Sequence, residues 1–73
     1  MAYPVISVEM TGARIHEILQ DRGISVAAVS RFLGINRSSM YKVLRGESLM
    51  SLDNIYALSV YLGIGINDLI VAA

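Results

Sequence analysis

The chain has 73 residues, no cysteine and no net charge, with six basic and six acidic side chains. This length indicates one small domain, and the lack of cysteine excludes disulfides and thiolate metal sites and fits a reducing, cytoplasmic environment. The N-terminus shows no secretory signal pattern. The most apolar stretch, Ile55 to Ile66, is about half the ~20 residues that a membrane span requires.

Charge is unevenly distributed along the chain. Residues 1–24 carry a net charge of −1, residues 25–50 carry +3 and residues 51–73 carry −2. The positive charge therefore lies in the middle of the chain, where we expect any nucleic-acid contact. Hydrophobic residues make up 55% of the chain, which is above the ordinary ~45–50%. We therefore expect part of the apolar surface to face a second copy or another partner.

Residues 1–10 have the pattern of an extended arm that precedes a folded domain at residues 11–73. Pro4 is followed by the β-branched, roughly alternating run from Val5 to Val8, which is typical of a strand. An isolated strand is unstable. The arm therefore folds over its own domain, pairs with a second chain or remains a frayed terminus. We expect Tyr3 to face the core or a dimer partner.

Capping residues and apolar spacing predict an all-α domain of five short helices after the arm. In chain order, the first helix runs from an N-cap at Thr11 to about Arg22, the second from Ser25 to Leu33, the third from about Arg37 to Arg45, the fourth from Ser51 to Gly63, and the fifth from about Ile66 to Val71. The predicted core-facing residues are Ile15, Ile18, Leu19, Val29, Phe32, Leu33, Met40, Val43, Leu44, Leu52, Ile55, Leu58, Leu62, Leu69 and Ile70.

The second and third helices are joined by a tight turn from Leu33 to Asn36. Gly34 ends the second helix, because glycine adopts the left-handed conformation without steric cost, and Asn36 is a favoured N-cap for the third. A turn this short makes the helices cross steeply, as in a helix-turn-helix. Five residues of the third helix lie off its apolar stripe and are candidates for DNA contact: Arg37, Ser38, Tyr41, Lys42 and Arg45.

From about Thr11 to Ile70 the chain resembles the Cro and phage-repressor type of helix-turn-helix domain, also called the XRE family. The resemblance rests on motifs in the order and spacing of that family: Arg14-Ile15, Gly23-Ile24-Ser25, Leu33-Gly34-Ile35-Asn36, Arg37-Ser38-Ser39-Met40-Tyr41, Arg45-Gly46-Glu47, Leu52 through Leu58, Leu62-Gly63-Ile64 and Asp68-Leu69. It implies a compact, lambda-repressor-like bundle of five helices with a short extended N-terminal arm.

The resemblance also implies that the third helix lies in the major groove of double-stranded DNA. By position, Arg37, Ser38 and Tyr41 contact bases, and Arg37 is best suited because a guanidinium donates two bonds to guanine. Ser25, Lys42 and Arg45 contact phosphates; for Tyr41, packing on the domain is an open alternative. These roles imply a sequence-specific transcriptional regulator that binds, as a homodimer, an operator with half-sites about 34 Å apart. A repressor is the first choice, and an activator is an open alternative.

Two positions depart from the family pattern. Val26 stands where the family usually has a glutamine that supports phosphate and base contacts, and Ser30 stands where alanine is usual. Val26, the zero net charge and the excess of apolar residues leave a second interpretation open. This is a protein-interaction or antitoxin-like adaptor on the same scaffold. A third interpretation is a peptide that lies at a membrane interface.

The sequence contains no set of residues typical of catalysis. His16 is the only histidine, so a zinc site would need carboxylates alone beside it. Glu17 and Asp21 fit a solvated helix face, and no phosphate-binding loop or nucleophile–base pair is present. We therefore expect no enzyme activity, cofactor, metal, membrane contact or small-molecule ligand. We expect Arg31 to be solvated, with a contact to a phosphate as the alternative, and Tyr56 and Tyr61 to lie in the core or on a dimer surface.

Overall fold

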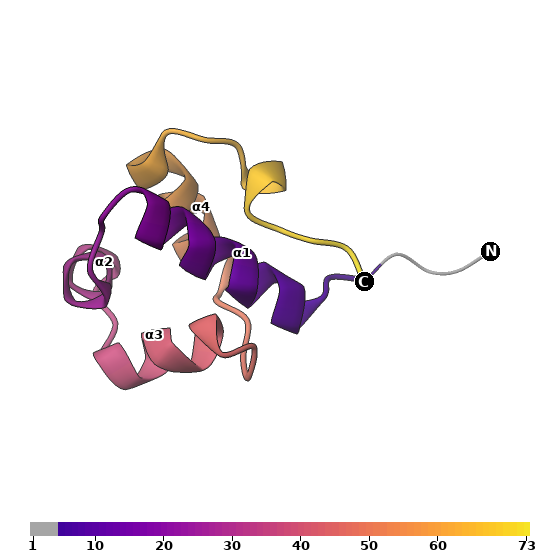
Figure 1. Ribbon diagram of the computed structural model, residues 1–73, viewed down its shortest axis with the longest axis horizontal. Helices are drawn as coiled ribbons and strands as arrows, with labels where there is room; N and C mark the ends of the chain where they lie inside the picture. The colour runs from indigo at the N-terminus through magenta and orange to yellow at the C-terminus, as the bar shows by residue number, and fades with distance from the viewer. Residues whose placement is uncertain (1–4) are drawn as a thin grey trace.

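The computed structural model describes residues 5–73, which form four α-helices and one short 3-10 helix (Figure 1). The elements are α1 (Val8–Asp21), α2 (Val26–Leu33), α3 (Arg37–Leu44), α4 (Leu52–Leu62) and η1 (Ile66–Asp68). The all-α class is confirmed, but the predicted fifth helix is only the 3-10 turn of η1. No helix in residues 5–73 has the length and apolar character needed to cross a membrane.

Helices α2, α3 and α4 begin where the sequence predicts them. Ser25 Oγ, Asn36 Oδ1 and Ser51 Oγ each accept a hydrogen bond from the backbone N–H three residues on, at 3.1, 2.8 and 3.2 Å. Each bond satisfies one backbone donor that the first turn of a helix leaves without a helical partner. These three helix starts therefore depend on residues that are close together in the sequence.

Helix α1 begins earlier than predicted. Its N-cap is Ser7, whose Oγ accepts a hydrogen bond from the Met10 N–H at 3.1 Å. Thr11 is therefore not the cap. It is buried inside α1, and its hydroxyl oxygen accepts a hydrogen bond from the Val71 N–H at 3.0 Å. The predicted arm thus enters α1 at residue 8, and Tyr3 lies outside the described residues.

The residues just before α1 pair with the C-terminal end of the same chain. The Ser7 N–H donates to the Val71 carbonyl at 2.8 Å, and the Ala73 N–H donates to the Val5 carbonyl at 2.9 Å. Between them lies one antiparallel bridge, which involves residues 6 and 72. Figure 1 accordingly shows the C-terminal segment beside the entry to α1. Of the three arrangements considered for the arm, residues 5–7 adopt the one that folds onto their own domain.

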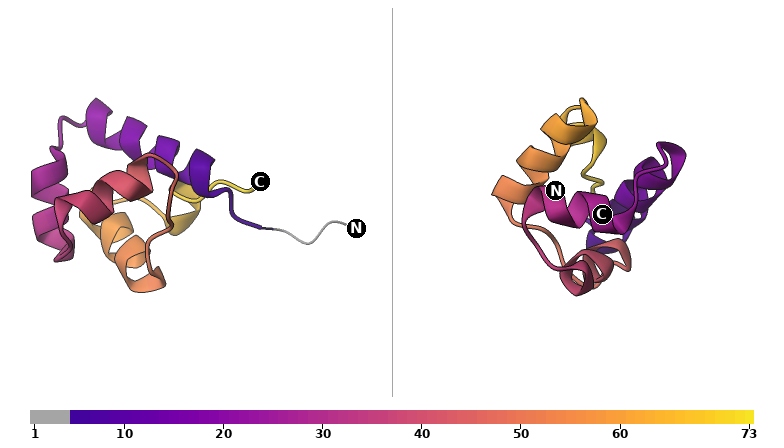
Figure 2. Two further views of the ribbon diagram at one scale, coloured as in Figure 1. Left: turned by 90° about the horizontal axis from the view of Figure 1, so that it is seen from below. Right: turned by 90° about the vertical axis from the view of Figure 1, so that its left-hand side faces the viewer.

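The core is one cluster to which all four helices and the C-terminal segment contribute. Helix α3 packs on α1 and α2, whereas α4 packs on α2 and η1, and Figure 2 shows this arrangement in two further views. Two predicted core residues are in fact on the surface: Leu52 is 72% exposed and Phe32 is 49% exposed. The buried hydrophobic residues are Ile15, Leu19, Val29, Met40, Val43, Leu44, Met50, Ile55, Leu58, Leu62 and Leu69.

Two glycines lie where α1 meets the C-terminal end of α3. A Cβ on Gly12 would lie 2.2 Å from the Val43 carbonyl oxygen, and a Cβ on Gly46 would lie 2.8 Å from Glu9 Cα. Real Cβ atoms do not approach other atoms this closely. Glycine at both positions therefore lets α1 pack directly against the backbone at the end of α3, and this contact sets the position of α3 in the bundle.

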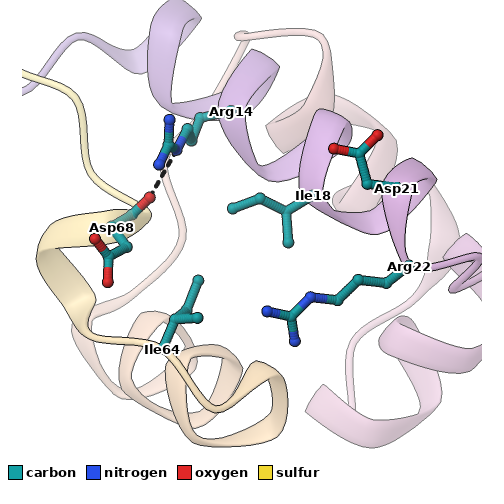
Figure 3. A pocket seen from close by; sticks show the side chains of 6 residues that line it. All are labelled: Arg14, Ile18, Asp21, Arg22, Ile64 and Asp68. Atoms are coloured by element: carbon teal, nitrogen blue, oxygen red, sulfur yellow. Dashed lines mark hydrogen bonds between the residues drawn. The ribbon is translucent and has the colours of Figure 1, made fainter.

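Arg14 of α1 and Arg22, the residue that caps the C-terminal end of α1, hold η1 and the end of α4 against that helix (Figure 3). Arg14 Nε donates to the Asp68 carbonyl at 2.8 Å, and Arg22 Nη1 donates to the carbonyl of Leu62, the last residue of α4. A cation near the carbonyl end of a helix also interacts favourably with the helix dipole. Together with Ile18, Asp21, Ile64 and Asp68, the arginines line a hollow of about 280 Å³.

Candidate nucleic-acid interface

Helices α2 and α3 are joined by a tight turn in which each backbone conformation fits its residue. Gly34 caps α2 with φ 70°, in the left-handed region that glycine adopts without strain. The Ile35 N–H then donates to the Ser30 carbonyl at 3.1 Å, and Asn36 begins α3 with an extended backbone. The predicted helix-turn-helix is therefore present, with α3 packed against both α1 and α2.

Helix α3 has one buried side and one exposed side. Met40, Val43 and Leu44 are buried in the core, so their side chains anchor the helix. The five α3 side chains predicted to contact DNA lie on the exposed side, and Tyr41 among them is 45% exposed. The exposed residues from the start of α3 to its C-cap are Arg37, Ser38, Ser39, Tyr41, Lys42 and Arg45.

Ser38 forms part of the cap of α3. The Ser38 hydroxyl donates to Asn36 Oδ1 at 2.7 Å. Asn36 Oδ1 also accepts a hydrogen bond from the Ser39 N–H at 2.8 Å. Because its hydrogen is engaged in this way, the Ser38 hydroxyl offers lone pairs to an approaching molecule. In this conformation it accepts hydrogen bonds and does not donate them, so it matches a donor such as an exocyclic amino group of adenine or cytosine.

Arg45 is paired with Glu47, an acidic residue for which the sequence predicted no role of its own. Its Nε donates to Glu47 Oε2 at 2.6 Å, and this is the one ion pair in the part of the chain that the structure describes. The hydrogen bond, together with the attraction of the opposite charges, lowers the pKa of Glu47 and raises the pKa of Arg45. Glu47 is therefore charged at neutral pH and offsets the charge of Arg45.

The first turn of α2 contains backbone donors that have no partner within the helix. The Ser25 hydroxyl oxygen accepts from the Ala28 N–H at 3.1 Å. The N–H groups of Val26 and Ala27 precede the first helical hydrogen bond and are the donors that a phosphate can use. The Val26 side chain is half-buried against the core, so it adds no polar contact where the family usually has a glutamine.

Other residues considered from the sequence lie apart from this interface. His16, Glu17 and Asp21 are exposed on α1, and residues 5–73 hold no group of three or more acidic or histidine side chains that can bind a metal ion. Tyr56 and Tyr61 are 61% and 39% exposed on α4. The core alternative is therefore wrong for both tyrosines, and the surface alternative remains.

Comparisons with known proteins agree with this geometry. The Cro/C1-type HTH DNA-binding domain matches residues 14–72. The restriction-modification controller protein C.AhdI from Aeromonas hydrophila is 31% identical to this chain in sequence. Its high-resolution crystal structure matches with a TM-score of 0.77, over 85% of this chain and 94% of that chain. Among curated proteins, none matches the sequence significantly.

More distant solved structures share the fold. The master regulator for biofilm formation SinR, solved in complex with DNA, is 21% identical with a TM-score of 0.73, over 82% of this chain and 97% of that chain. The clp gene regulator ClgR from Corynebacterium glutamicum is 17% identical with a TM-score of 0.81, over 89% of this chain and 69% of that chain. The matching family is one of transcription regulators and not of enzymes. The chain belongs to the Cro/C1-type helix-turn-helix family of DNA-binding domains.

Proposed function

We propose that this DNA-binding transcription regulator is a repressor that binds its operator as a homodimer, with α3 of each protomer in the major groove. One observation carries the proposal. The exposed side of α3 presents Arg37 and Lys42, and the helix contains no acidic residue. A short helix that is anchored by buried side chains and carries cations on its outer side fits a groove lined by phosphates.

Base contacts are assigned to the first turns of α3. Arg37 is exposed at the start of the helix, where a guanidinium can donate two hydrogen bonds to guanine O6 and N7, worth about 1–3 kcal/mol of discrimination. Ser38 accepts a hydrogen bond from an exocyclic amino group, because its own hydrogen is donated to Asn36. Tyr41 lies one turn later, where its ring packs on a thymine methyl group or its hydroxyl reaches a phosphate.

Phosphate contacts are assigned to the flanks of the base-reading residues. Lys42 contacts one phosphate, and the N-terminus of α2 behind Ser25 contacts another through backbone N–H groups. Arg45 contacts a third phosphate once its bond to Glu47 is exchanged for one to DNA. Three neutralised phosphates in each protomer give a log–log salt slope of roughly −5 for the dimer.

Repression follows from occupancy, since a dimer that covers both half-sites excludes polymerase from the same DNA. The test is selection of operators from a random duplex pool. We expect one enriched motif with two-fold symmetry and half-sites about 34 Å apart, or one helical turn. A promoter that carries this motif is then expected to direct less transcription when the protein is present. Enrichment of no motif would refute the proposal.

Replacing Arg37 by alanine tests the base contact within the same selection. Arg37→Ala is expected to relax the preference at one position in each half-site. The control is Arg31→Ala, because Arg31 is an exposed cation on α2 and not on α3. It removes the same charge and is expected to leave the enriched motif unchanged. An unchanged motif with Arg37→Ala would show that Arg37 does not read a base.

A second candidate, a protein-interaction adaptor on the same scaffold, is favoured by the exposed apolar surface of α4. Leu52, Tyr56 and Val60 are each more than 60% exposed. The adaptor interpretation expects no enriched DNA motif and a protein partner on α4. The repressor interpretation expects an enriched motif whatever covers α4, so the same selection separates the two candidates.

A further inference from the structure

A row of three residues runs along the side of α1 that faces η1 and the end of α4. Arg14, Ile18 and Arg22 follow one another at intervals of four residues, so they lie one above another on the helix. The row has a cation at each end and an apolar residue in the middle. Helical rise places the two arginine Cα atoms about 12 Å apart. Ile64 lies across the hollow from this row (Figure 3).

The charges of the two arginines are not neutralised by the fold. Arg14 Nε donates to the Asp68 carbonyl at 2.8 Å, and Arg22 Nη1 donates to the Leu62 carbonyl. Both acceptors are neutral, and neither arginine forms an ion pair with a carboxylate of residues 5–73. A guanidinium has several N–H donors in a planar fork. Each arginine therefore keeps N–H donors and its full charge for a further acceptor.

The two carboxylates that line the hollow are directed elsewhere. Asp68 Oδ2 accepts a hydrogen bond from the Gly65 N–H at 3.1 Å, and Figure 3 shows this carboxylate turned away from both arginines. Asp21 is exposed, and its side chain leaves α1 in a different direction from that of Arg22 (Figure 3). The middle of the hollow is therefore formed by cationic and aliphatic groups, with carboxylates at its rim.

We propose that this hollow binds a short aliphatic dicarboxylate, with one carboxylate on Arg14, the other on Arg22 and the methylene chain on Ile18 and Ile64. The planar fork of a guanidinium matches a carboxylate through two parallel hydrogen bonds. Both isoleucines are half-buried against the core, so they present a fixed apolar surface between the two cations. This arrangement of charge, aliphatic surface and charge is the complement of a dicarboxylate.

The dimensions and exposure of the hollow limit the ligand and its affinity. A volume of about 280 Å³ is close to the lower end of the range for ligand pockets, about 300–1,000 Å³. The ligand is therefore smaller than a drug-sized molecule. Arg14 and Arg22 are exposed, and water and salt weaken contacts between exposed charges. We therefore expect a dissociation constant in the millimolar range that rises with ionic strength.

The other hollow of the protein does not have this chemistry. It has a volume of about 340 Å³ and is lined, among residues 5–73, by Val5, Ile6, Asn67, Ile70 and Ala72, none of which is charged. It therefore serves as an internal control. The sequence predicted no small-molecule ligand because the first hollow forms only in the folded chain, where Arg14 meets Asp68 across 54 residues.

Titrations followed by the methyl NMR signals of the protein test the proposal. The probes are succinate, glutarate and adipate, each compared at constant ionic strength with the monocarboxylate of the same chain length (butyrate, valerate and hexanoate). We expect saturable shifts at Ile18 and Ile64 and none at Val5. The best dicarboxylate should bind about tenfold more tightly than its monocarboxylate, because it gains a second charge-assisted contact. Equal affinity for the two, or no saturable shift at millimolar concentrations, would overturn the proposal.

Substitution of each arginine tests which groups hold the two carboxylates. Arg14→Gln and Arg22→Gln keep a donor for the backbone carbonyl, and a circular-dichroism melt checks that each variant is folded. Each is expected to lower the affinity for the dicarboxylate to that for the monocarboxylate. The control Arg31→Gln removes an exposed cation of α2 and is expected to change neither affinity. Dicarboxylate binding that is unchanged in Arg14→Gln or Arg22→Gln would overturn the proposal, and the chain-length series tests it in the wild-type protein alone.

Asp21→Asn tests the sign of the charge that the hollow accepts. Removal of an anion from the rim is expected to tighten binding of the dicarboxylate severalfold, because like charges repel. Weaker binding in Asp21→Asn would show that the carboxylate attracts the ligand, which contradicts recognition of a dianion. These titrations contain no DNA and involve no residue assigned to the operator contact. Their failure therefore leaves the proposed function standing, and a failed operator selection leaves the dicarboxylate site standing.

Discussion

Replacing Gly12 by alanine tests the contact that places α3 in the bundle. The new Cβ would lie 2.2 Å from the Val43 carbonyl oxygen, whereas ordinary contacts begin at 3.4 Å, so the helices must separate by about 1 Å. That carbonyl also accepts the Gly46 N–H at 3.0 Å. Both clashing groups belong to helix backbones, and neither can move away by changing a side-chain rotamer.

The expected cost follows from two opposing effects. Overpacking of a well-packed core typically costs about 1–3 kcal/mol, and the backbone clash at Gly12 places this substitution at the upper end. Alanine recovers about 1 kcal/mol because it is a better helix former than glycine. We therefore expect Gly12→Ala to lower the free energy of unfolding by about 2 kcal/mol, which is a fall in Tm of roughly 8–16 °C for a domain of this size.

Thermal and urea unfolding followed by circular dichroism measure this loss. Gly65→Ala is the matched control. Gly65 has φ −76°, and its added Cβ would meet only Asp68 Oδ2, at 3.5 Å. The control is expected to raise the free energy of unfolding by about 0.4–1 kcal/mol through a less flexible unfolded chain. A Gly12→Ala protein that melts at or above the wild-type temperature would refute the described packing of α1 on α3.

Two further substitutions test buried and exposed polar groups. Ser30 is 3% exposed, and its hydroxyl has no hydrogen-bond partner. Ser30→Ala is therefore expected to raise the free energy of unfolding by about 1 kcal/mol in urea titrations. A loss of stability would show that the Ser30 hydroxyl does have a hydrogen-bond partner. Glu47→Gln removes the anion that neutralises Arg45. It is expected to tighten operator binding severalfold in gel-shift titrations, because Arg45 no longer exchanges its bond to Glu47 for one to a phosphate, whereas unchanged binding would exclude Arg45 as a phosphate contact.

Local signals in the sequence predicted the helix-turn-helix correctly because the responsible interactions span three or four residues. The Asn36 cap reaches only to Ser39, and the left-handed conformation of Gly34 is a property of glycine itself. The exposed residues of α3 follow from the same periodicity, since burial of Met40 and Val43 determines which side faces outward. The roles assigned to those exposed residues remain predictions.

Errors arose where distant parts of the chain determine local structure. Thr11 has the pattern of an N-cap, but it lies inside α1, where its hydroxyl oxygen accepts a hydrogen bond from the Val71 N–H. Leu52 fits the apolar spacing of α4 and yet is exposed. Periodicity identifies apolar positions, but it does not show which of them lie against the core and which against a second molecule.

Stability and DNA binding are connected in this protein because α3 is only eight residues long. A helix this short is not stable alone in water, so its shape depends on its packing against α1 and α2. Operator DNA binds only the folded protein and should stabilise it by about 2.7 kcal/mol at a concentration of 100 times Kd. If α3 is displaced in Gly12→Ala, that variant must bind operator more weakly than wild type even at temperatures where both are folded. Equal operator affinity of the two folded proteins would show that the Gly12 contact supports stability alone and does not set the position of α3 on DNA.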